Sequence, residues 1–292
     1  MILDACKMLQ FPADSLDVLL DTEARILALP EAAQELETAI RQLMNSPEKD
    51  YIDNMQRISE LTAIPRMTVD MVVLLAAAEP LKTRYAAAGL PESLMWESLA
   101  DLRYKLYECK AVHGIWGTFV SRWFQRFYQL ERFKLGRLEY EKIPYKWEPP
   151  FHNVKTGDPV VNIHIPSDGP LKEEMVRQSI HMAWEFYKDD FGGIVPFECH
   201  SWMLYPPLRE AVFADGSNIA KFHDLFCIPE WQDQPENKDF WRVFNIPWSD
   251  DALEKAPADT SLRRSLLAHL KAGGTMGEGL GVFVYDGEKI IK

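Results

Sequence analysis

Two histidines in the second half of the chain alternate with other side chains in a pattern typical of β-strands. His164 follows Asn162 at a spacing of two, and His200 lies between Glu198 and Trp202 at the same spacing. Because successive side chains of a strand point to opposite faces, each set would share one face of a sheet. Imidazole titrates close to neutrality, so His164 or His200 could act as a general base. A buried histidine with only a structural role is the alternative.

Three further side chains lie near these histidines in the sequence or in the predicted sheet. Glu139 and Glu141 alternate on an earlier stretch of strand character. They could bind a cationic substrate, although exposed strand carboxylates without such a role are also common. Cys199 adjoins His200, but neighbouring strand residues point to opposite faces, which argues against a cysteine–histidine pair. We therefore expect Cys199 to lie in the core.

The motifs of several enzyme classes are missing from the sequence. There is no GxSxG elbow, no Walker loop and no HExxH, so a serine hydrolase, a nucleotide hydrolase and a zinc protease are not supported. A glycine run leaves a predicted helix and enters a predicted strand, which reverses the order found in a dinucleotide-binding fingerprint. We interpret this run as a helix stop and turn; it comprises Gly273, Gly274, Gly277, Gly279 and Gly281.

Composition and charge limit the partners and the compartment. The 44 acidic residues outnumber the 32 basic ones, and a net charge of -12 disfavours nucleic acid and anionic membranes. The four cysteines form no CxxC pair, so neither a disulfide framework nor a metal site is predicted. No stretch approaches about 20 apolar residues, and the N-terminus does not resemble an export signal. We therefore expect a soluble, cytoplasmic protein.

The elements that must position these side chains fall into two groups along the chain. A length of 292 residues favours two domains. Apolar residues recur at helical spacing before residue 135, and strand signals appear only after it. We expect an all-helical N-terminal domain over 1–134, with helices that include 31–44, 68–88 (kinked or split at Pro80) and 119–128.

The second domain, 135–292, is predicted to be a mixed β-sheet with flanking helices, of the α+β or α/β class. A helix at 170–190 between two strands implies a parallel crossover. The predicted strands are 138–143, 160–165, 197–204, 222–228 and 240–246, followed by a helix at 261–272 and a hairpin over 282–291.

Four segments of the chain resemble a bacterial acyltransferase family that joins a helical N-terminal domain to a GNAT-like domain. They are GRLEYE, VVNIHIPSDGPL, FECHSWML and GGTMGEGLGVF. The resemblance implies acyl transfer from acyl-coenzyme A to a small-molecule acceptor, which we expect to be an amine. It also implies that the helical domain covers or restricts the acceptor cleft.

The resemblance implies roles for individual residues as well. The strand at 160–165 would splay from its neighbour to admit the thioester, His164 and His200 would flank the cleft, and Tyr205 would protonate the leaving thiolate. A structural alternative for Tyr205 is packing on the two prolines that follow it. The pyrophosphate would lie on the loop and helix start at Ser167, Gly169, Leu171 and Lys172. From the alternation of strand residues, and not from the resemblance, we expect the acceptor to contact Glu139, Glu141, Asn162, Glu198 and Trp202.

The loop at 167–172 also leaves another function open. It contains one glycine and a proline where the superfamily normally has two closely spaced glycines, and Asp168 would repel a phosphate. An ordinary capped helix start is the structural alternative. The second functional hypothesis is therefore a non-catalytic module on the same fold that binds an acyl ligand or a protein.

Overall fold

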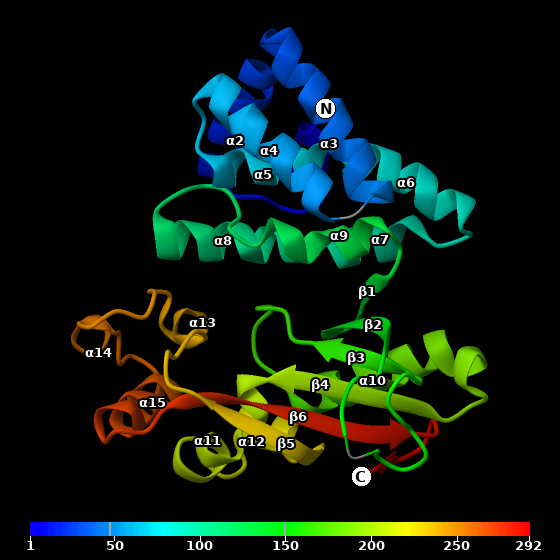
Figure 1. Ribbon diagram of the computed structural model, residues 1–292, viewed down its shortest axis with the longest axis vertical. Helices are drawn as coiled ribbons and strands as arrows, with labels where there is room; N and C mark the ends of the chain where they lie inside the picture. The colour runs from blue at the N-terminus through cyan, green and yellow to red at the C-terminus, as the bar shows by residue number, and fades with distance from the viewer. Residues whose placement is uncertain (47, 149) are drawn as a thin grey trace. The chain divides into compact units, whose positions relative to one another are not determined.

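The chain forms two compact units, Met1–Lys134 and Leu135–Lys292, in a computed structural model that describes residues 1–46, 48–148 and 150–292 (Figure 1). They are called unit 1 and unit 2 below. Among the described residues, no helix has the length and apolar character needed to cross a membrane.

Unit 1 consists of helices that surround one buried helix, α5 (Arg66–Ala76). Residues 68–76 of α5 are all buried, as expected of a helix with neighbours on every side. Pro30 begins α3, where its missing N–H costs no helical hydrogen bond. The elements are α1 (Leu3–Met8), α2 (Ala13–Ala28), α3 (Pro30–Asn45), α4 (Glu48–Thr62), α5, α6 (Ala78–Ala87), α7 (Glu92–Leu99), α8 (Asp101–His113), the 3-10 turn η1 (Ser121–Phe124) and α9 (Gln125–Tyr128).

Unit 1 departs from the predicted helices in two places. The predicted helix at 68–88 is split, but at Ala77 instead of at Pro80, which lies in the first turn of α6, where proline is tolerated. The aromatic stretch at 119–128 forms η1 and the single turn α9, not one continuous helix. Strand β1 (Arg132–Leu135) begins before the residue where strands were first expected.

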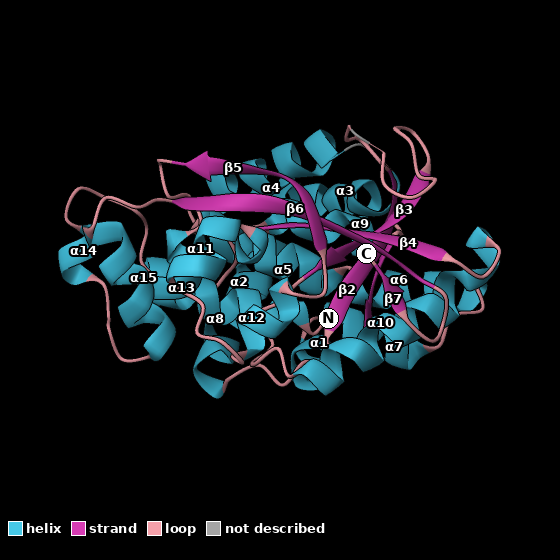
Figure 2. Ribbon diagram, turned by 90° about the horizontal axis from the view of Figure 1, so that it is seen from below, coloured by secondary structure: helices cyan, strands magenta, loops and turns pink. Residues whose placement is uncertain are grey.

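Unit 2 is built on a seven-stranded mixed sheet with the order β1-β2-β3-β4-β6-β5, and β7 pairs with β6. Strands β3 and β4 run parallel and are joined by the helix α10 (Glu173–Tyr187), so the predicted crossover is confirmed. Strand β6 pairs antiparallel with β4, β5 and β7, and β5 and β6 run side by side in Figure 2. The strands are β2 (Leu138–Pro144), β3 (Pro159–His164), β4 (Val195–Ser201), β5 (Cys227–Gln234), β6 (Met276–Tyr285) and β7 (Ile290–Ile291).

Short helices and turns complete unit 2. They are the 3-10 turns η2 (Lys188–Phe191) and η3 (Trp202–Leu204) and the helices α11 (Pro206–Ala211), α12 (Asn218–His223), α13 (Phe240–Phe244), α14 (Ala252–Lys255) and α15 (Ser261–Lys271). The predicted helix at 261–272 and hairpin at 282–291 are confirmed.

Two of the predicted strands are wrong. Residues 240–244 form α13, because Phe240, Val243 and Phe244 recur at helical spacing and are buried together. Phe222 belongs to α12, whose N-terminus is capped by the Ser217 hydroxyl, so β5 starts only at Cys227.

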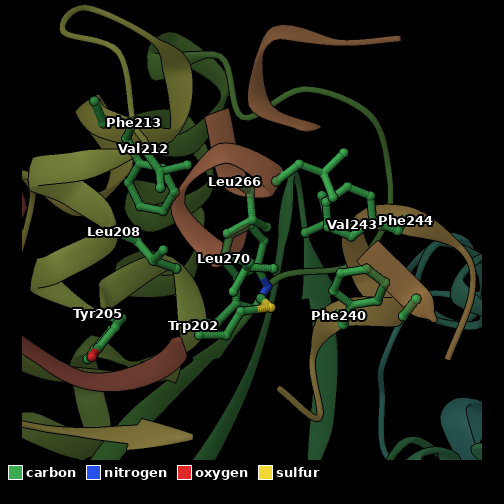
Figure 3. Packing of buried hydrophobic residues seen from close by; sticks show 14 residues of the cluster. Trp202, Tyr205, Leu208, Val212, Phe213, Phe240, Val243, Phe244, Leu266 and Leu270 are labelled. Atoms are coloured by element: carbon green, nitrogen blue, oxygen red, sulfur yellow. The ribbon is translucent and has the colours of Figure 1, made fainter. Parts of the chain in front are cut away.

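The predicted strand at 197–204 is also too long. Strand β4 ends at Ser201, whose hydroxyl accepts a hydrogen bond from the Met203 N–H and begins the turn η3. Trp202 therefore leaves the strand and joins an apolar cluster, where its ring lies 6.0 Å from that of Phe213 in an edge-on arrangement (Figure 3). Trp202 does not share a strand face with Glu198 and His200, contrary to the prediction.

The two faces of the sheet have different chemistry. One face, called the apolar face, carries Tyr140, Phe197 and Phe283, and α10 packs on it through Ser179, whose Oγ lies 2.9 Å from the Tyr140 hydroxyl. Cys199 lies on this face and is buried, as predicted. The opposite face, called the polar face, carries the glutamates and histidines of the candidate site next to an apolar cluster in which Leu280 and Val282 pack with Tyr145 and Phe151.

Three glycines of the predicted turn lie inside β6 and allow the chain to pack closely on the apolar face. A Cβ on Gly277 would lie 2.4 Å from the Tyr205 ring, and one on Gly281 would lie 2.7 Å from side-chain atoms of Leu204 and Phe226. A Cβ on Gly279 would lie 2.0 Å from the carbonyl oxygen of Leu204. The glycine run is therefore structural, but it serves close packing against a strand as well as the helix stop.

We predict that Gly279→Ala strongly destabilises unit 2, because the added methyl group meets backbone that cannot rotate away. The expected loss is about 3 kcal/mol, at the upper end of overpacking effects. Gly192→Ala is the matched control, because its φ of 65° is unfavourable for alanine but nothing lies within 4 Å of the new Cβ. It should cost only about 1 kcal/mol. Urea unfolding checks the pair, and equal losses would contradict the close-packing interpretation.

Candidate active site

The parallel pairing between β3 and β4 is short. It covers Val161 with Phe197 and Asn162 with Glu198. Each strand continues on its outer side, where β2 pairs with β3 as far as His164 and β6 pairs with β4 as far as Ser201. Among these described residues, the facing edges of β3 and β4 are therefore not paired with each other beyond Asn162 and Glu198. We call this region the β3–β4 opening.

The polar face brings several predicted site residues together next to this opening. In the strand register Glu139 stands opposite His164, and Glu141 stands opposite Asn162, which in turn neighbours Glu198. Directly opposed residues of paired strands share a face and lie close together. The structure thus gathers side chains from β2, β3 and β4 that are far apart in the sequence.

His164 is held by a carboxylate. Its Nε2 lies 2.8 Å from Oε1 of Glu141, and Asn162 Nδ2 lies 3.3 Å from the same imidazole nitrogen. The side chains of His164 and Glu141 are 16% and 6% exposed, so this is a mostly buried pair. One imidazole nitrogen is occupied by these contacts, which fits the structural role that the sequence left open.

His200 is oriented in a way that suits proton transfer. Its Nδ1 faces Glu278 Oε2 at 3.6 Å, and its ring stacks on Trp147 with centroids 5.3 Å apart. Glu278 is fixed in turn by Gln232, whose amide donates to Oε1 at 2.6 Å, and by Lys238 at 3.7 Å. The His200 side chain is 33% exposed, so part of the imidazole ring is accessible to solvent. A carboxylate close to Nδ1, beyond hydrogen-bond distance, and a partly exposed ring are compatible with a general base.

Glu198 is a buried carboxyl two residues before His200. Burial raises the pKa of Glu198 from 4.5 to about 7, Lys146 opposes that rise, and the negative charge of Glu141 adds to it. Its Oε2 has no hydrogen-bond partner among the described residues. A carboxyl with this pKa exchanges its proton near neutral pH, so Glu198 is a candidate acid or base beside the opening.

Tyr205 lies on the opposite side of the sheet from His200. Its hydroxyl donates a hydrogen bond to Asp233 Oδ1, and its ring packs on Gly277, the register partner of Asp233. His200 is the register partner of Leu280, an odd number of positions from Gly277, so the two sets point to different faces. The structure does not bring Tyr205 together with His164 and His200, and its role as proton donor stays a prediction.

The loop proposed for pyrophosphate is organised by Arg137, a residue that the sequence reasoning did not single out. The Arg137 guanidinium donates to the carbonyl oxygens of Pro166 at 3.0 Å and of Gly169 at 2.6 Å. In a trans peptide the carbonyl and the next N–H point in opposite directions, so the Ser167 N–H is directed away from Arg137. Leu171 is buried and can offer only its backbone to a ligand.

The helix that follows this loop starts with acidic side chains. Lys172 is exposed and precedes α10, whose first turn contains Glu173 and Glu174. Glu173 forms ion pairs with Arg177 at 2.9 Å and with Lys221 at 3.3 Å, which reduce its repulsion of an anion. In the described parts of unit 2 and unit 1, no group of three His, Cys, Asp or Glu side chains could hold a metal ion.

The raised pKa of Glu198 predicts a pH-dependent stability. Between pH 4.5 and about 7 the folded protein keeps a proton that the unfolded chain has released, so stability falls as pH rises through this window. Glu198→Gln removes this loss and should gain about 3 kcal/mol over wild type between pH 4 and pH 8. Denaturant unfolding at several pH values checks this. Glu174→Gln, at an exposed carboxylate, is the control, and parallel curves for wild type and Glu198→Gln would contradict the prediction.

Comparison with known proteins agrees with this architecture. Residues 2–130 match the N-acyltransferase N-terminal domain family, and residues 132–283 match the GNAT-like C-terminal domain family. A comparison with curated protein sequences gives no match.

Solved structures of acyltransferases have a similar fold over the whole chain. The chain is 24% identical to one in complex with decanoyl-CoA (TM-score 0.73), 21% identical to one with decanoyl-CoA and teicoplanin (0.71) and 20% identical to one with CoA and 10C-teicoplanin (0.72). Each comparison covers 96% of this chain and 86% of the other. At these identities the likeness concerns the fold, and it confirms the helical domain followed by a GNAT-like sheet. Because the GNAT-like match covers more than half of its length, this chain belongs to the GNAT-like acyltransferase family with an N-acyltransferase N-terminal domain.

Proposed function

We propose that this protein transfers an acyl group from acyl-coenzyme A to an amino group of a small molecule, with His200 as the general base. The observation that carries the proposal is the His200 imidazole, which is oriented by Glu278 and lies beside the β3–β4 opening. Acyltransferases of similar fold bind decanoyl-CoA and teicoplanin, which supports the same reaction class here.

The β3–β4 opening is the proposed place for the thioester. Strand edges that are not paired with each other can direct backbone N–H groups at the thioester oxygen, and such donors stabilise the negative charge that develops there. The pyrophosphate would lie on the backbone of the loop that Arg137 holds, near Ser167, Gly169, Leu171 and Lys172. Decanoyl and octanoyl chains are the first donors to test, because similar acyltransferases bind both esters.

In the proposed reaction, one side chain first accepts a proton from the acceptor amine and then donates it to the leaving thiolate. The His200 Nε2 takes a proton from the acceptor amine as its nitrogen attacks the thioester carbonyl carbon. The new C–N bond forms, the C–S bond breaks, and the imidazolium returns the proton to the departing thiolate. Glu278 stabilises the imidazolium between these steps. This scheme makes His200 sufficient without a second proton donor.

The carboxylates of the polar face favour a cationic acceptor. Glu139 and Glu141 lie on β2 and Glu198 lies on β4, on either side of β3, and Glu141 already holds His164. Negative potential at a partly buried surface raises the local concentration of ammonium groups. We propose that Glu198 and Asn162 contact the amine-bearing part of the acceptor. Glu139 is fully buried and Trp202 lies in the apolar cluster, so we propose structural roles for both.

The direct test incubates the protein with octanoyl-CoA or decanoyl-CoA and a panel of aminated small molecules. Mass spectrometry should find an acylated amine, and thiol release should match it one to one. A non-catalytic acyl-ligand module would instead bind acyl-coenzyme A and form no product. That outcome would replace the transferase proposal.

We predict that His200→Asn lowers kcat/KM by on the order of a hundredfold or more, because it removes the base without removing the thioester site. The acidic limb of the pH–rate profile should disappear with it. His164→Asn is the matched control: it should lower the melting temperature but keep the limb, because His164 is bound to Glu141.

Glu198→Gln tests whether the buried carboxyl, whose pKa is raised to about 7, is the base instead of His200. If His200 is the base, the pH–rate profile of Glu198→Gln keeps its acidic limb. If Glu198→Gln abolishes the limb and His200→Asn keeps it, the buried carboxyl is the base and the assignment to His200 is wrong.

We further predict that Tyr205→Phe keeps turnover within a few-fold of wild type. Its hydroxyl is bound to Asp233 on the other face, so the variant should lose about 1 kcal/mol of stability from the missing hydrogen bond. Steady-state kinetics and thermal unfolding measure the two effects. A hundredfold fall in kcat with unchanged stability would restore Tyr205 as the proton donor.

A further inference from the structure

A cavity in unit 1 has a chemistry opposite to that of the chain as a whole. Its volume is about 510 Å³, within the range of small-molecule pockets. Four of its lining residues are arginines and none is an aspartate or glutamate, although the chain carries a net charge of -12. The lining, called the arginine cavity below, comprises Ile52, Arg66, Phe119, Val120, Ser121, Arg122, Trp123, Gln125, Arg126 and Arg132.

Arg66 and Arg132 are held in place by contacts with neighbouring side chains and backbone. Arg66 bonds through its Nε to Asp70, whose other carboxylate oxygen accepts from the Ser121 hydroxyl at 2.7 Å. The Arg132 guanidinium lies 3.8 Å from the Trp123 ring centroid and donates to the Trp123 carbonyl oxygen at 2.8 Å. Such contacts hold the guanidinium groups in place before any ligand arrives, which reduces the entropy lost on binding.

The other two arginines lie at the surface of the cavity. Arg122 and Arg126 are exposed, and Arg126 forms an ion pair with Glu131 at 3.2 Å, where solvent weakens the interaction. Asp70 and Glu131 offset part of the positive charge of the four arginines, and a bound anion would add to that compensation inside the cavity. The planar fork of arginine matches two oxygens of a phosphate group at once.

We infer that the arginine cavity binds an organic anion that carries phosphate groups. Two guanidinium groups held by their neighbours, two exposed ones and the aromatic rings of Trp123 and Phe119 fit a phosphorylated ligand with an apolar or planar part better than a bare ion. The phosphate end of coenzyme A and a separate phosphorylated compound share this chemistry. The inference does not depend on the proposed transferase activity, because every lining residue belongs to unit 1.

Calorimetric titration of the full chain with inorganic pyrophosphate at constant ionic strength tests the inference. Wild type should bind it, and Arg122→Gln/Arg126→Gln should bind at least tenfold more weakly. The control is Arg41→Gln/Arg57→Gln, which removes the same charge from exposed residues outside the cavity. No binding to wild type, or equal weakening in the control, would overturn the inference.

Two further arms make the result specific. Arg122→Lys/Arg126→Lys keeps the positive charge but removes the planar guanidinium fork, so its affinity for pyrophosphate should lie between those of wild type and Arg122→Gln/Arg126→Gln. If the glutamine double variant does not fold, the lysine double variant replaces it in the test. A second titration with pyrophosphate, at saturating coenzyme A, identifies the source of the ligand. If pyrophosphate still binds and the binding still depends on Arg122 and Arg126, the natural ligand is a separate phosphorylated compound. If coenzyme A abolishes the binding of pyrophosphate, coenzyme A itself fills the cavity. If coenzyme A does not bind at all, the transferase proposal fails while the pyrophosphate titration still reports on the cavity.

Discussion

The limited pairing of β3 with β4 is the constraint on which the chemistry of unit 2 depends. Two parallel strands that are each paired on their outer side, but joined to each other only as far as Asn162 and Glu198, leave backbone edges that a ligand can use. An ordinary sheet would close these edges with its own hydrogen bonds. The cost of leaving them open is offset when a ligand supplies acceptors, which is why we propose this local weakness of the fold as the place for the thioester.

Electrostatics then decides which side chains beside the opening can work as acids and bases. Burial raises the pKa of Glu198 to about 7, and the negative charge of Glu141, on the far side of β3, adds to that rise. Glu141 finds its partner in His164, whereas Glu278 faces His200 at 3.6 Å. A glutamate thus has a different effect on each histidine. His164 is hydrogen-bonded to Glu141 and mostly buried, whereas His200, near Glu278, is partly exposed. Unit 1 has the reverse polarity at the arginine cavity.

Periodicity was sufficient to predict the fold class and to place His164 and Asn162 on one strand face, because both depend only on local alternation. It failed at Trp202, where one capping serine ends the strand, and at Phe240, where a short apolar run fits a helix as well as a strand. Glu278 was missed because it lies within a glycine run and meets His200 only through the pairing of β4 with β6. Contacts of this kind depend on strand register, which no local pattern in one sequence encodes.

The most direct measurement is a crystal structure of the protein with a non-transferable acyl-coenzyme A analogue in which the thioester sulfur is replaced by a methylene group. The analogue's carbonyl oxygen should accept hydrogen bonds from the facing edges of β3 and β4, with its carbonyl carbon exposed on the polar face that carries His200. An acyl group bound elsewhere, with the β3–β4 opening occupied only by water, would contradict the proposed site.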